Sequence, residues 1–182
     1  MLFNSFEFLI FFPLVTILYF LLPHRFRWIH LLIASCAFYM FFIWYYFLIL
    51  VFTIVIDYYA GLWIEATLDP VKRKRWLLLS VIANVGVLCV FKYYNFFAIS
   101  FTELINGFGF QVNPVLIKVI LPVGISFYTF HGLSYVIDIY YKRIKAETNF
   151  IDYSLFVSYF PLLVAGPIER ATHLLPQVKV KR

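Results

Sequence analysis

The sequence predicts an all-α fold: a polytopic membrane helical bundle of about five transmembrane helices, with one further segment that is re-entrant or partly buried. Of its 182 residues, 64% are hydrophobic and only 13% are charged, and the mean hydropathy is +0.89. A soluble domain carries about 25% charged residues. Apolar runs of span length also alternate with short clusters of Lys and Arg. These two observations exclude a soluble enzyme, a disordered regulator and a nucleic-acid-binding domain.

The first apolar segment, Ser5 to Leu22, is long enough to cross a hydrocarbon core of about 30 Å. It lacks the basic leader of a cleaved signal peptide, because Glu7 precedes the first basic residue, Arg25. We therefore expect a retained helix. It tolerates Pro13 if neighbouring helices satisfy the freed carbonyl, and it ends at the polar cluster 23–27.

The segment from Trp28 to Ile64 holds one acidic residue, Asp57, and no Lys or Arg. As a single helix it would be about 55 Å long, well beyond what a bilayer requires. We therefore expect two antiparallel spans with a turn near Trp44–Tyr46, where the aromatic side chains suit the membrane interface. A polar loop at Lys72–Arg75 then leads into a fourth span, 76–94.

A short interfacial helix is expected from Phe96 to Ile105, because that stretch is only weakly polar. The fifth span runs from Val115 to Tyr140 and contains Pro122–Gly124, which predicts a kinked or broken helix. The next apolar stretch, Tyr153–Gly166, has about 14 residues, too few for a full span. Since Pro161 also interrupts it, we expect a re-entrant segment there.

The distribution of basic residues predicts the orientation of the spans. With an extracytoplasmic N-terminus, three basic clusters lie on the cytoplasmic side, as the positive-inside rule requires: 25–27, 72–75 and 142–145. No linker divides the chain, so residues 1–182 are predicted to form a single transmembrane domain. Cys36 and Cys89 lie in apolar runs and predict neither a disulfide framework nor a metal site.

Four ionisable residues lie inside apolar segments: Asp57, Lys92, His131 and Asp138. Charges at membrane depth are costly, so each is a candidate functional residue. For Asp57 and Asp138 the alternative is a structural pairing with a Lys or Arg of a nearby loop, and for Lys92 it is an interface anchor. His131 lies in mid-segment, after the Pro122–Gly124 break. Its side chain either lines a polar cavity or has its hydrogen-bonding groups paired within the core.

The usual motifs of soluble enzymes are absent from the sequence. Gly124-Ile125-Ser126 lacks the second glycine of a nucleophile elbow. There is no phosphate-binding loop, no dinucleotide fingerprint and no paired-histidine zinc spacing. The residues alone therefore predict a polytopic membrane protein with a polar, broken fifth helix, and they predict no metal site and no bound cofactor.

Two groups of motifs carry a family resemblance. The first is Leu121–His131 (LPVGISFYTFH), followed by Ser134–Tyr140 (SYVIDIY). The second is Phe156–Pro161 (FVSYFP), which leads into Ala165–Arg170 (AGPIER) and Leu175–Gln177 (LPQ). Together they resemble the signature regions of the membrane-bound O-acyltransferase family. The likeness is greatest to the bacterial branch that contains the alginate O-acetyltransferase membrane subunit, and it covers nearly the whole chain in order.

The resemblance implies a helical bundle around a tunnel in the bacterial cytoplasmic membrane. An activated acyl group, carried as a thioester by a coenzyme or carrier, would enter from the cytoplasmic side. It would leave on a hydroxyl of an extracytoplasmic polysaccharide or acceptor protein. The residues that would line or support such a tunnel are Asp57, Ser126, His131, Asp138 and Arg170, since a lumen needs wettable groups.

Members of this family are longer than this chain, and their catalytic histidine is expected beyond residue 182, so no catalytic residue is assigned within it. The chain resembles the N-terminal part of an enzyme that O-acetylates a cell-surface polysaccharide. Two alternatives stay open: a D-alanyl transferase of the same family, and a truncated, catalytically inactive membrane protein. A transporter is less well supported, because no inverted repeat is present.

Overall fold

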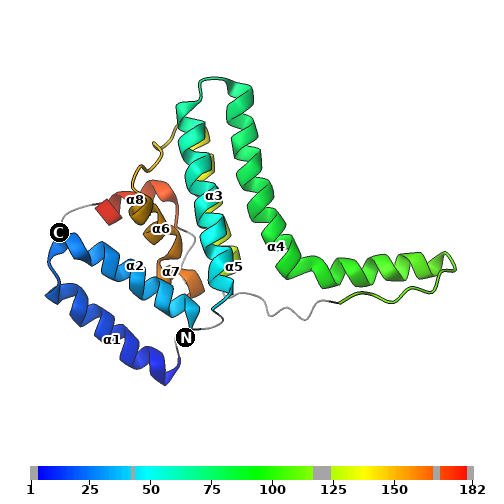
Figure 1. Cartoon of the computed structure of the whole chain (residues 1–182), viewed down its shortest axis with the longest axis horizontal. Coiled ribbons are helices and arrows are strands. Elements are labelled where there is room, and N and C mark those ends of the chain that lie inside the picture. The colour runs from blue at the N-terminus through cyan, green and yellow to red at the C-terminus, as the bar shows by residue number, and fades with distance from the viewer. Residues whose placement is uncertain (1–3, 42–43, 117–123, 166–168, 180–182) are drawn as a thin grey trace.

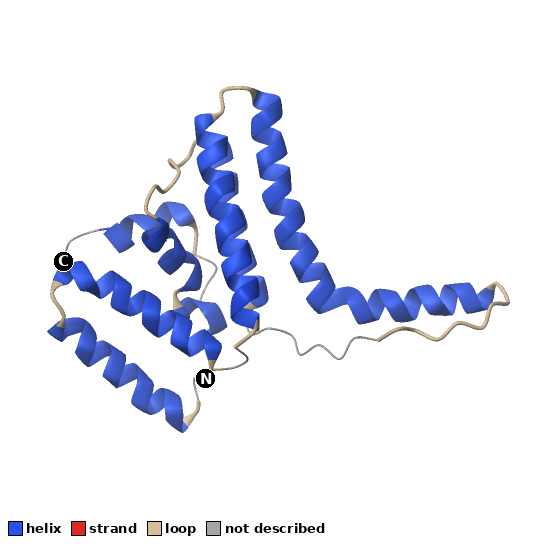
Figure 2. Cartoon of the chain, in the orientation of Figure 1, coloured by secondary structure: helices blue, strands red, loops and turns tan. Residues whose placement is uncertain are grey.

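The computed structural model describes residues 4–41, 44–116, 124–165 and 169–179. These residues form helices and no strand (Figure 2), which confirms the all-α prediction. In chain order the helices are α1 (Phe6–Leu21), α2 (His24–Met40), α3 (Tyr46–Ala66), α4 (Pro70–Gly107), α5 (Ile125–Tyr140), α6 (Phe150–Ser158), α7 (Phe160–Ala165) and α8 (Ala171–Lys179).

The helices α1 and α2 form an antiparallel pair beside the rest of the molecule (Figure 1). The side chain of Ser5 caps α1 by accepting a hydrogen bond from the backbone N–H of Phe8 at 3.2 Å. Pro13 lies inside α1, as predicted. The first helix ends before the cluster 23–27, as predicted, because α1 ends at Leu21. Most of the cluster is itself helical, since α2 begins at His24, directly after Pro23.

Three long helices, α3, α4 and α5, surround the largest hydrophobic core. They run alongside one another (Figure 1), and α3 contacts both α4 and α5. Gly61 allows a close approach of α3 and α5, because a Cβ at this position would lie 2.8 Å from Cε1 of Tyr135. The core also includes residues of α6, and its largest fully buried side chains are Leu50, Ile64, Ile125, Tyr128, Tyr135, Val136, Tyr153, Phe156 and Leu163.

A single helix, α4, replaces three predicted elements. The expected loop at Lys72–Arg75 is wrong, because α4 begins at Pro70 and Asp69 caps it by accepting from the N–H of Val71 at 2.8 Å. The expected separation of a span ending at residue 94 from an interfacial helix at 96–105 is also wrong. No proline or glycine lies between residues 87 and 106 to end the helix. The helix continues to Gly107 and changes direction along its length (Figure 1).

The helix α5 corresponds to the second part of the fifth predicted span. Residues 117–123, which include Pro122, lie outside the described residues. The helix α5 begins at Ile125, after Gly124 in the left-handed conformation (φ +78°). A Cβ on Gly124 would lie 2.6 Å from the carbonyl oxygen of Leu163 in α7. Glycine therefore meets both the backbone angle and the close contact that bring α5 against α7.

The apolar stretch 153–166 is divided into two short helices. Asn149 caps α6 by accepting from the N–H of Ile151 at 3.0 Å. The break between α6 and α7 falls at Tyr159, because Pro161 has no backbone N–H with which to continue the hydrogen-bond pattern of α6. The N–H of Phe160 donates instead to Oγ of Ser35 in α2 at 3.2 Å. The helix α6 is buried from Tyr153 to Ser158, as expected of a partly buried segment.

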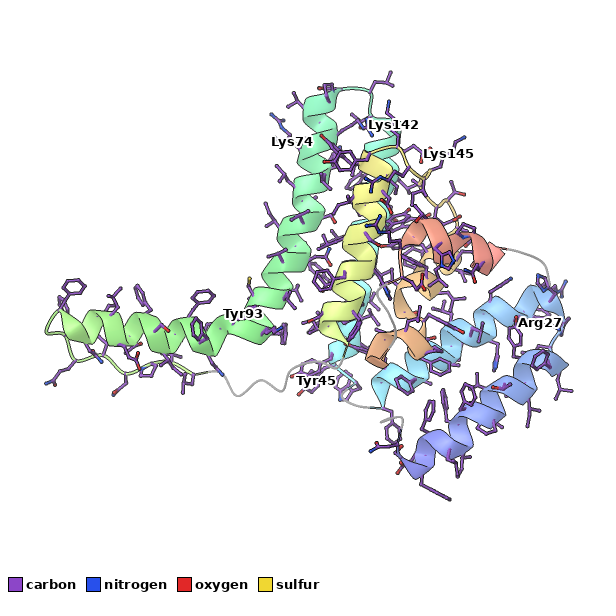
Figure 3. All side chains as sticks on the ribbon, turned by 180° about the vertical axis from the view of Figure 1, so that it is seen from behind. Arg27, Tyr45, Lys74, Tyr93, Lys142 and Lys145 are labelled. Carbon is purple, nitrogen blue, oxygen red and sulfur yellow. The ribbon has the colours of Figure 1, made fainter. Side chains whose placement is uncertain are left out.

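Among the described residues, two helices are long and apolar enough to cross a bilayer, α3 and α4. The helix α1 and the stretch 150–163 are apolar but shorter, so the count of about five spans stays a prediction. Lys74, Lys142 and Lys145 gather at one end of the long helices, whereas Tyr45 and Tyr93 lie at the other (Figure 3). Two of the three predicted basic clusters thus lie at the same end of these helices, and the orientation of the spans stays a prediction.

Arg73 joins the ends of three helices at this basic end. From the first turns of α4, its Nε donates to the carbonyl of Ile64 at 3.2 Å. Its Nη2 donates to the carbonyl of Tyr140 at 2.8 Å and, more weakly, to that of Ile139 at 3.4 Å. These carbonyls belong to the last turns of α3 and α5, which lack partners within their own helices and carry partial negative charge.

Substituting Arg73 by alanine is expected to lower the free energy of unfolding by about 1.5–3 kcal/mol, since hydrogen bonds from a charged donor are lost. Lysine at this position should recover little of the lost stability, because one ammonium group cannot reach both helix ends as a guanidinium does. Thermal unfolding of the intact protein in detergent measures the loss. The control is Lys74→Ala at a neighbouring exposed position, expected to change stability by less than about 0.5 kcal/mol. Equal effects of the two variants would contradict the role of Arg73.

Candidate functional site

Asp57 lies at the centre of a buried polar cluster between α3 and α4. Its side chain is fully buried. Its Oδ1 accepts a hydrogen bond from Oγ of Ser80 at 2.5 Å and another from Nδ2 of Asn84 at 2.7 Å. Nδ2 of Asn84 also donates to the carbonyl of Ser80 at 3.0 Å. No Lys or Arg among the described residues forms an ion pair with Asp57, so the predicted pairing with a loop residue is not found.

The helix α5 closes this cluster from a third side at Gly132. A Cβ on Gly132 would fall on Oδ2 of Asp57 and lie 3.1 Å from its Cγ. The carboxyl group therefore fills the space that the missing side chain leaves. In this arrangement Asp57 fixes the rotation and spacing of α3, α4 and α5.

Asp138 forms an ion pair with a basic residue of a nearby loop, which was the alternative to a functional role for this residue. Its Oδ1 lies 3.0 Å from Nη1 of Arg143, in the loop after α5. The N–H of Arg143 also donates to the carbonyl of Asp138 at 2.8 Å. The side chain of Asp138 is 4% exposed and that of Arg143 is 53% exposed. The pair therefore lies at the surface end of α5 and orders the loop that follows.

His131 of α5 is buried against α6. Its imidazole packs against the ring of Phe156, with the two centroids 5.7 Å apart. Neither ring nitrogen has a hydrogen-bond partner among the described residues. Other buried hydroxyls of the same two helices also lack partners there: Tyr128, Thr129, Tyr153 and Ser154. Buried polar groups of this kind usually bind water or a ligand, so this interface can hydrogen-bond a small polar molecule.

A cavity of about 370 Å³ lies next to this interface, between the α1–α2 pair and the segment from α6 to α8. Phe156 contributes to its wall and also contacts His131. The lining is mostly apolar and aromatic, with a few polar groups. The polar lining residues are Thr16, Tyr19, Tyr159 and Gln177. Such a cavity suits an extended apolar molecule with a small polar part.

Among the described residues, no side-chain hydrogen bond or ion pair joins Ser126 or Arg170 to these groups. Ser126 is half-buried in the first turn of α5. Arg170 is exposed, and its backbone carbonyl begins α8 by accepting from the N–H groups of His173 and Leu174 at 3.0 and 3.1 Å. The described residues also contain no group of three His, Cys, Asp or Glu side chains that could hold a metal ion.

Two partners of Asp57, Ser80 and Asn84, were missed in the sequence. They lie four residues apart in an apolar stretch and therefore on one face of α4. From that spacing in the sequence, Ser80 and Asn84 could have been identified as candidate residues. Arg73 was also missed, because its position was assigned to a loop rather than to the first turns of a helix.

No family model matches the chain, and no solved structure matches it. Among curated proteins it is similar to the probable alginate O-acetylase of Pseudomonas aeruginosa, with 42% identity over 97% of this chain and 34% of that protein. The corresponding protein of Azotobacter vinelandii is 40% identical over 97% of this chain and 36% of its own length. The peptidoglycan O-acetyltransferase of Helicobacter pylori is 35% identical over 83% of this chain and 32% of its own length. The chain thus spans about a third of the length of the curated relatives it matches.

Proposed function

We propose that the chain belongs to the membrane-bound O-acyltransferase family and forms part of an enzyme that transfers an acetyl group to hydroxyls of a cell-surface polysaccharide. The observation that carries the proposal is the identity of 42% to a probable alginate O-acetylase, sustained over 97% of the chain. The names of the relatives favour acetyl over D-alanyl transfer. The higher identity to the alginate enzymes favours an alginate-like acceptor over peptidoglycan.

The enzyme is proposed to reside in the bacterial cytoplasmic membrane, with its N-terminus outside and the Lys74–Lys142 end of the bundle inside. The acetyl donor is proposed to be a thioester of a coenzyme or carrier that approaches from the inside. The acceptor hydroxyl is proposed to approach from the outside, on a polysaccharide or on a protein that passes the acetyl group on. The general base that activates this hydroxyl is not assigned to a residue of this chain.

His131 and the neighbouring cavity are proposed to line the path of the acyl group. The apolar cavity walls accommodate an extended thioester arm, and the polar lining groups provide hydrogen bonds to it. The unpartnered nitrogens of His131 supply a donor and an acceptor in the adjoining interface. In this role His131 orients a reactant and does not transfer a proton.

The proposed activity predicts that a host lacking the intact protein loses base-labile O-acetyl esters from its surface polysaccharide, and that the restored gene returns them. Supplying labelled acetate and hydrolysing the isolated polysaccharide with mild alkali measures these esters directly. Recovery of labelled alanine instead of acetate would identify the alternative D-alanyl transferase. A polysaccharide unchanged by loss of the protein would overturn the proposal.

Substitutions of His131, measured in the same assay, test the role of this residue separately from the activity of the whole enzyme. His131→Ala is expected to lower acetyl incorporation about tenfold, the effect of one hydrogen bond of about 1.4 kcal/mol. His131→Gln retains an amide donor and acceptor and should recover most of the activity. The control is His173→Ala, at an exposed histidine of α8. Full activity of His131→Ala at normal protein level would remove His131 from the path.

A further inference from the structure

The second half of α4 projects away from the rest of the molecule (Figure 1). We call residues 94–116 the arm. It consists of the last part of α4 and the extended chain that follows and turns back beside it (Figure 1). Asn106 fastens the turn, because its Nδ2 donates to the carbonyl of Val112 at 3.0 Å and its Oδ1 accepts from the N–H of Val112 at 2.8 Å. These two bonds satisfy the backbone N–H and C=O groups of Val112 within the arm itself.

The stretch of α4 from Lys92, just before the arm, to Asn106 within it is amphipathic. One exposed side carries apolar and aromatic residues at spacings of three and four, which places them on one face: Tyr93, Phe97, Phe101 and Leu104. The opposite side carries the polar residues Lys92, Asn95, Glu103 and Asn106, interrupted by Ile99. Phe97, Phe101 and Leu104 are each at least 60% exposed, so no described residue covers this apolar side.

The arm leaves the bundle at the end that carries aromatic residues. Tyr93 and Tyr45 lie at this end, whereas Lys74, Lys142 and Lys145 lie at the other, and the arm runs across the direction of the long helices (Figure 3). Tyrosine is enriched where membrane and water meet, and a helix that crosses a span at this level lies within the interface. We propose that the arm is embedded in the membrane–water interface of the leaflet opposite the basic end, with the apolar side named above in lipid.

A lipid surface explains the apolar side better than a protein partner does. The same side continues along the spanning part of α4 through Leu79, Ile82 and Val90, all of which are exposed. A helix packed along the span cannot also follow the arm, because α4 changes direction between them (Figure 1). Lipid can contact both parts. No Lys or Arg lies between residues 93 and 116, so the arm needs apolar burial and no anionic headgroups.

Site-directed spin labelling of the intact protein tests this placement. After Cys36→Ala and Cys89→Ala, single cysteines replace Phe97, Phe101, Asn95 or Glu103 and carry a nitroxide. The protein is then reconstituted in vesicles of pure phosphatidylcholine. Oxygen partitions into lipid and a nickel chelate stays in water, so the ratio of their relaxation effects reports depth. The ratio is expected to be several-fold higher at positions 97 and 101 than at 95 and 103.

Two results would overturn the proposal. Low accessibility to both reagents at positions 97 and 101 would show that protein covers the arm. High accessibility to the nickel chelate on both sides would place the arm in water. A label at Lys74→Cys, at the basic end, serves as the water-exposed control. Since all the labelled positions are exposed, none of these substitutions disturbs the core.

Discussion

Replacing Gly132 by alanine is expected to destabilise the protein by about 1–3 kcal/mol, the cost of adding a methyl group to a filled interior. The new Cβ would overlap Oδ2 of Asp57 and lie 3.1 Å from its Cγ. The carboxyl group cannot rotate away freely, because Ser80 and Asn84 hold its other oxygen at 2.5 and 2.7 Å. Either these two bonds break or α5 moves away from α3. Thermal unfolding of the intact protein in detergent measures the effect.

Gly86 provides the matched control for this substitution. It also lies within a long helix, α4, but a Cβ there would meet no atom within 4 Å. Gly86→Ala should therefore be neutral or stabilising by up to about 1 kcal/mol, since alanine has the higher helix propensity. If both variants lower the unfolding temperature equally, contact with Asp57 is not the reason that residue 132 is glycine.

The sequence predicted where apolar segments lie along the chain better than where each helix begins and ends. The turn predicted near Trp44–Tyr46 is confirmed, because α2 ends at Met40 and α3 begins at Tyr46. At Lys72–Arg75 the charges predicted a loop, but charged residues are also good helix formers. Asp69 and Pro70 are a cap and a first residue that begin a helix before this cluster. Local capping chemistry was therefore a better guide there than polarity.

The candidate residues show which site features a sequence can predict. The pairing of Asp138 with Arg143 was predictable, because the two lie five residues apart at one helix end. The partners of Asp57 were not, since Ser80 and Asn84 are 23 and 27 residues away on another helix. Their contact depends on how α3 and α4 rotate about their own axes. Apolar composition on all sides of a membrane helix gives little information about that rotation.

The hydrogen bond between Asn84 and Asp57 is expected to make these two residues strongly coupled. Asn84→Ala removes one donor to a buried carboxyl group, and Asp57→Ala removes the side-chain acceptor of both Asn84 and Ser80. Each single substitution should cost about 1–3 kcal/mol or more, because a buried polar group loses its partner. The hydroxyl of Ser80 loses its acceptor in Asp57→Ala and in the double variant alike. The bond between Asn84 and Asp57 can be lost only once, so the cost of the double variant should be smaller than the sum of the two single costs by about 0.5–3 kcal/mol.

Asp138 supplies the control for this double-mutant cycle. It lies six residues beyond Gly132 on α5, about 9 Å farther along the helix, and its partner is Arg143. Asn84→Ala and Asp138→Ala share no partner and should add to within about 0.5 kcal/mol. The free energies of unfolding come from the same detergent measurement. If the Asn84–Asp57 pair is additive as well, the cluster does not hold α3 and α4 together. Coupling in the first cycle alone would show that a buried carboxyl group sets the packing of the helices beside the proposed acyl path.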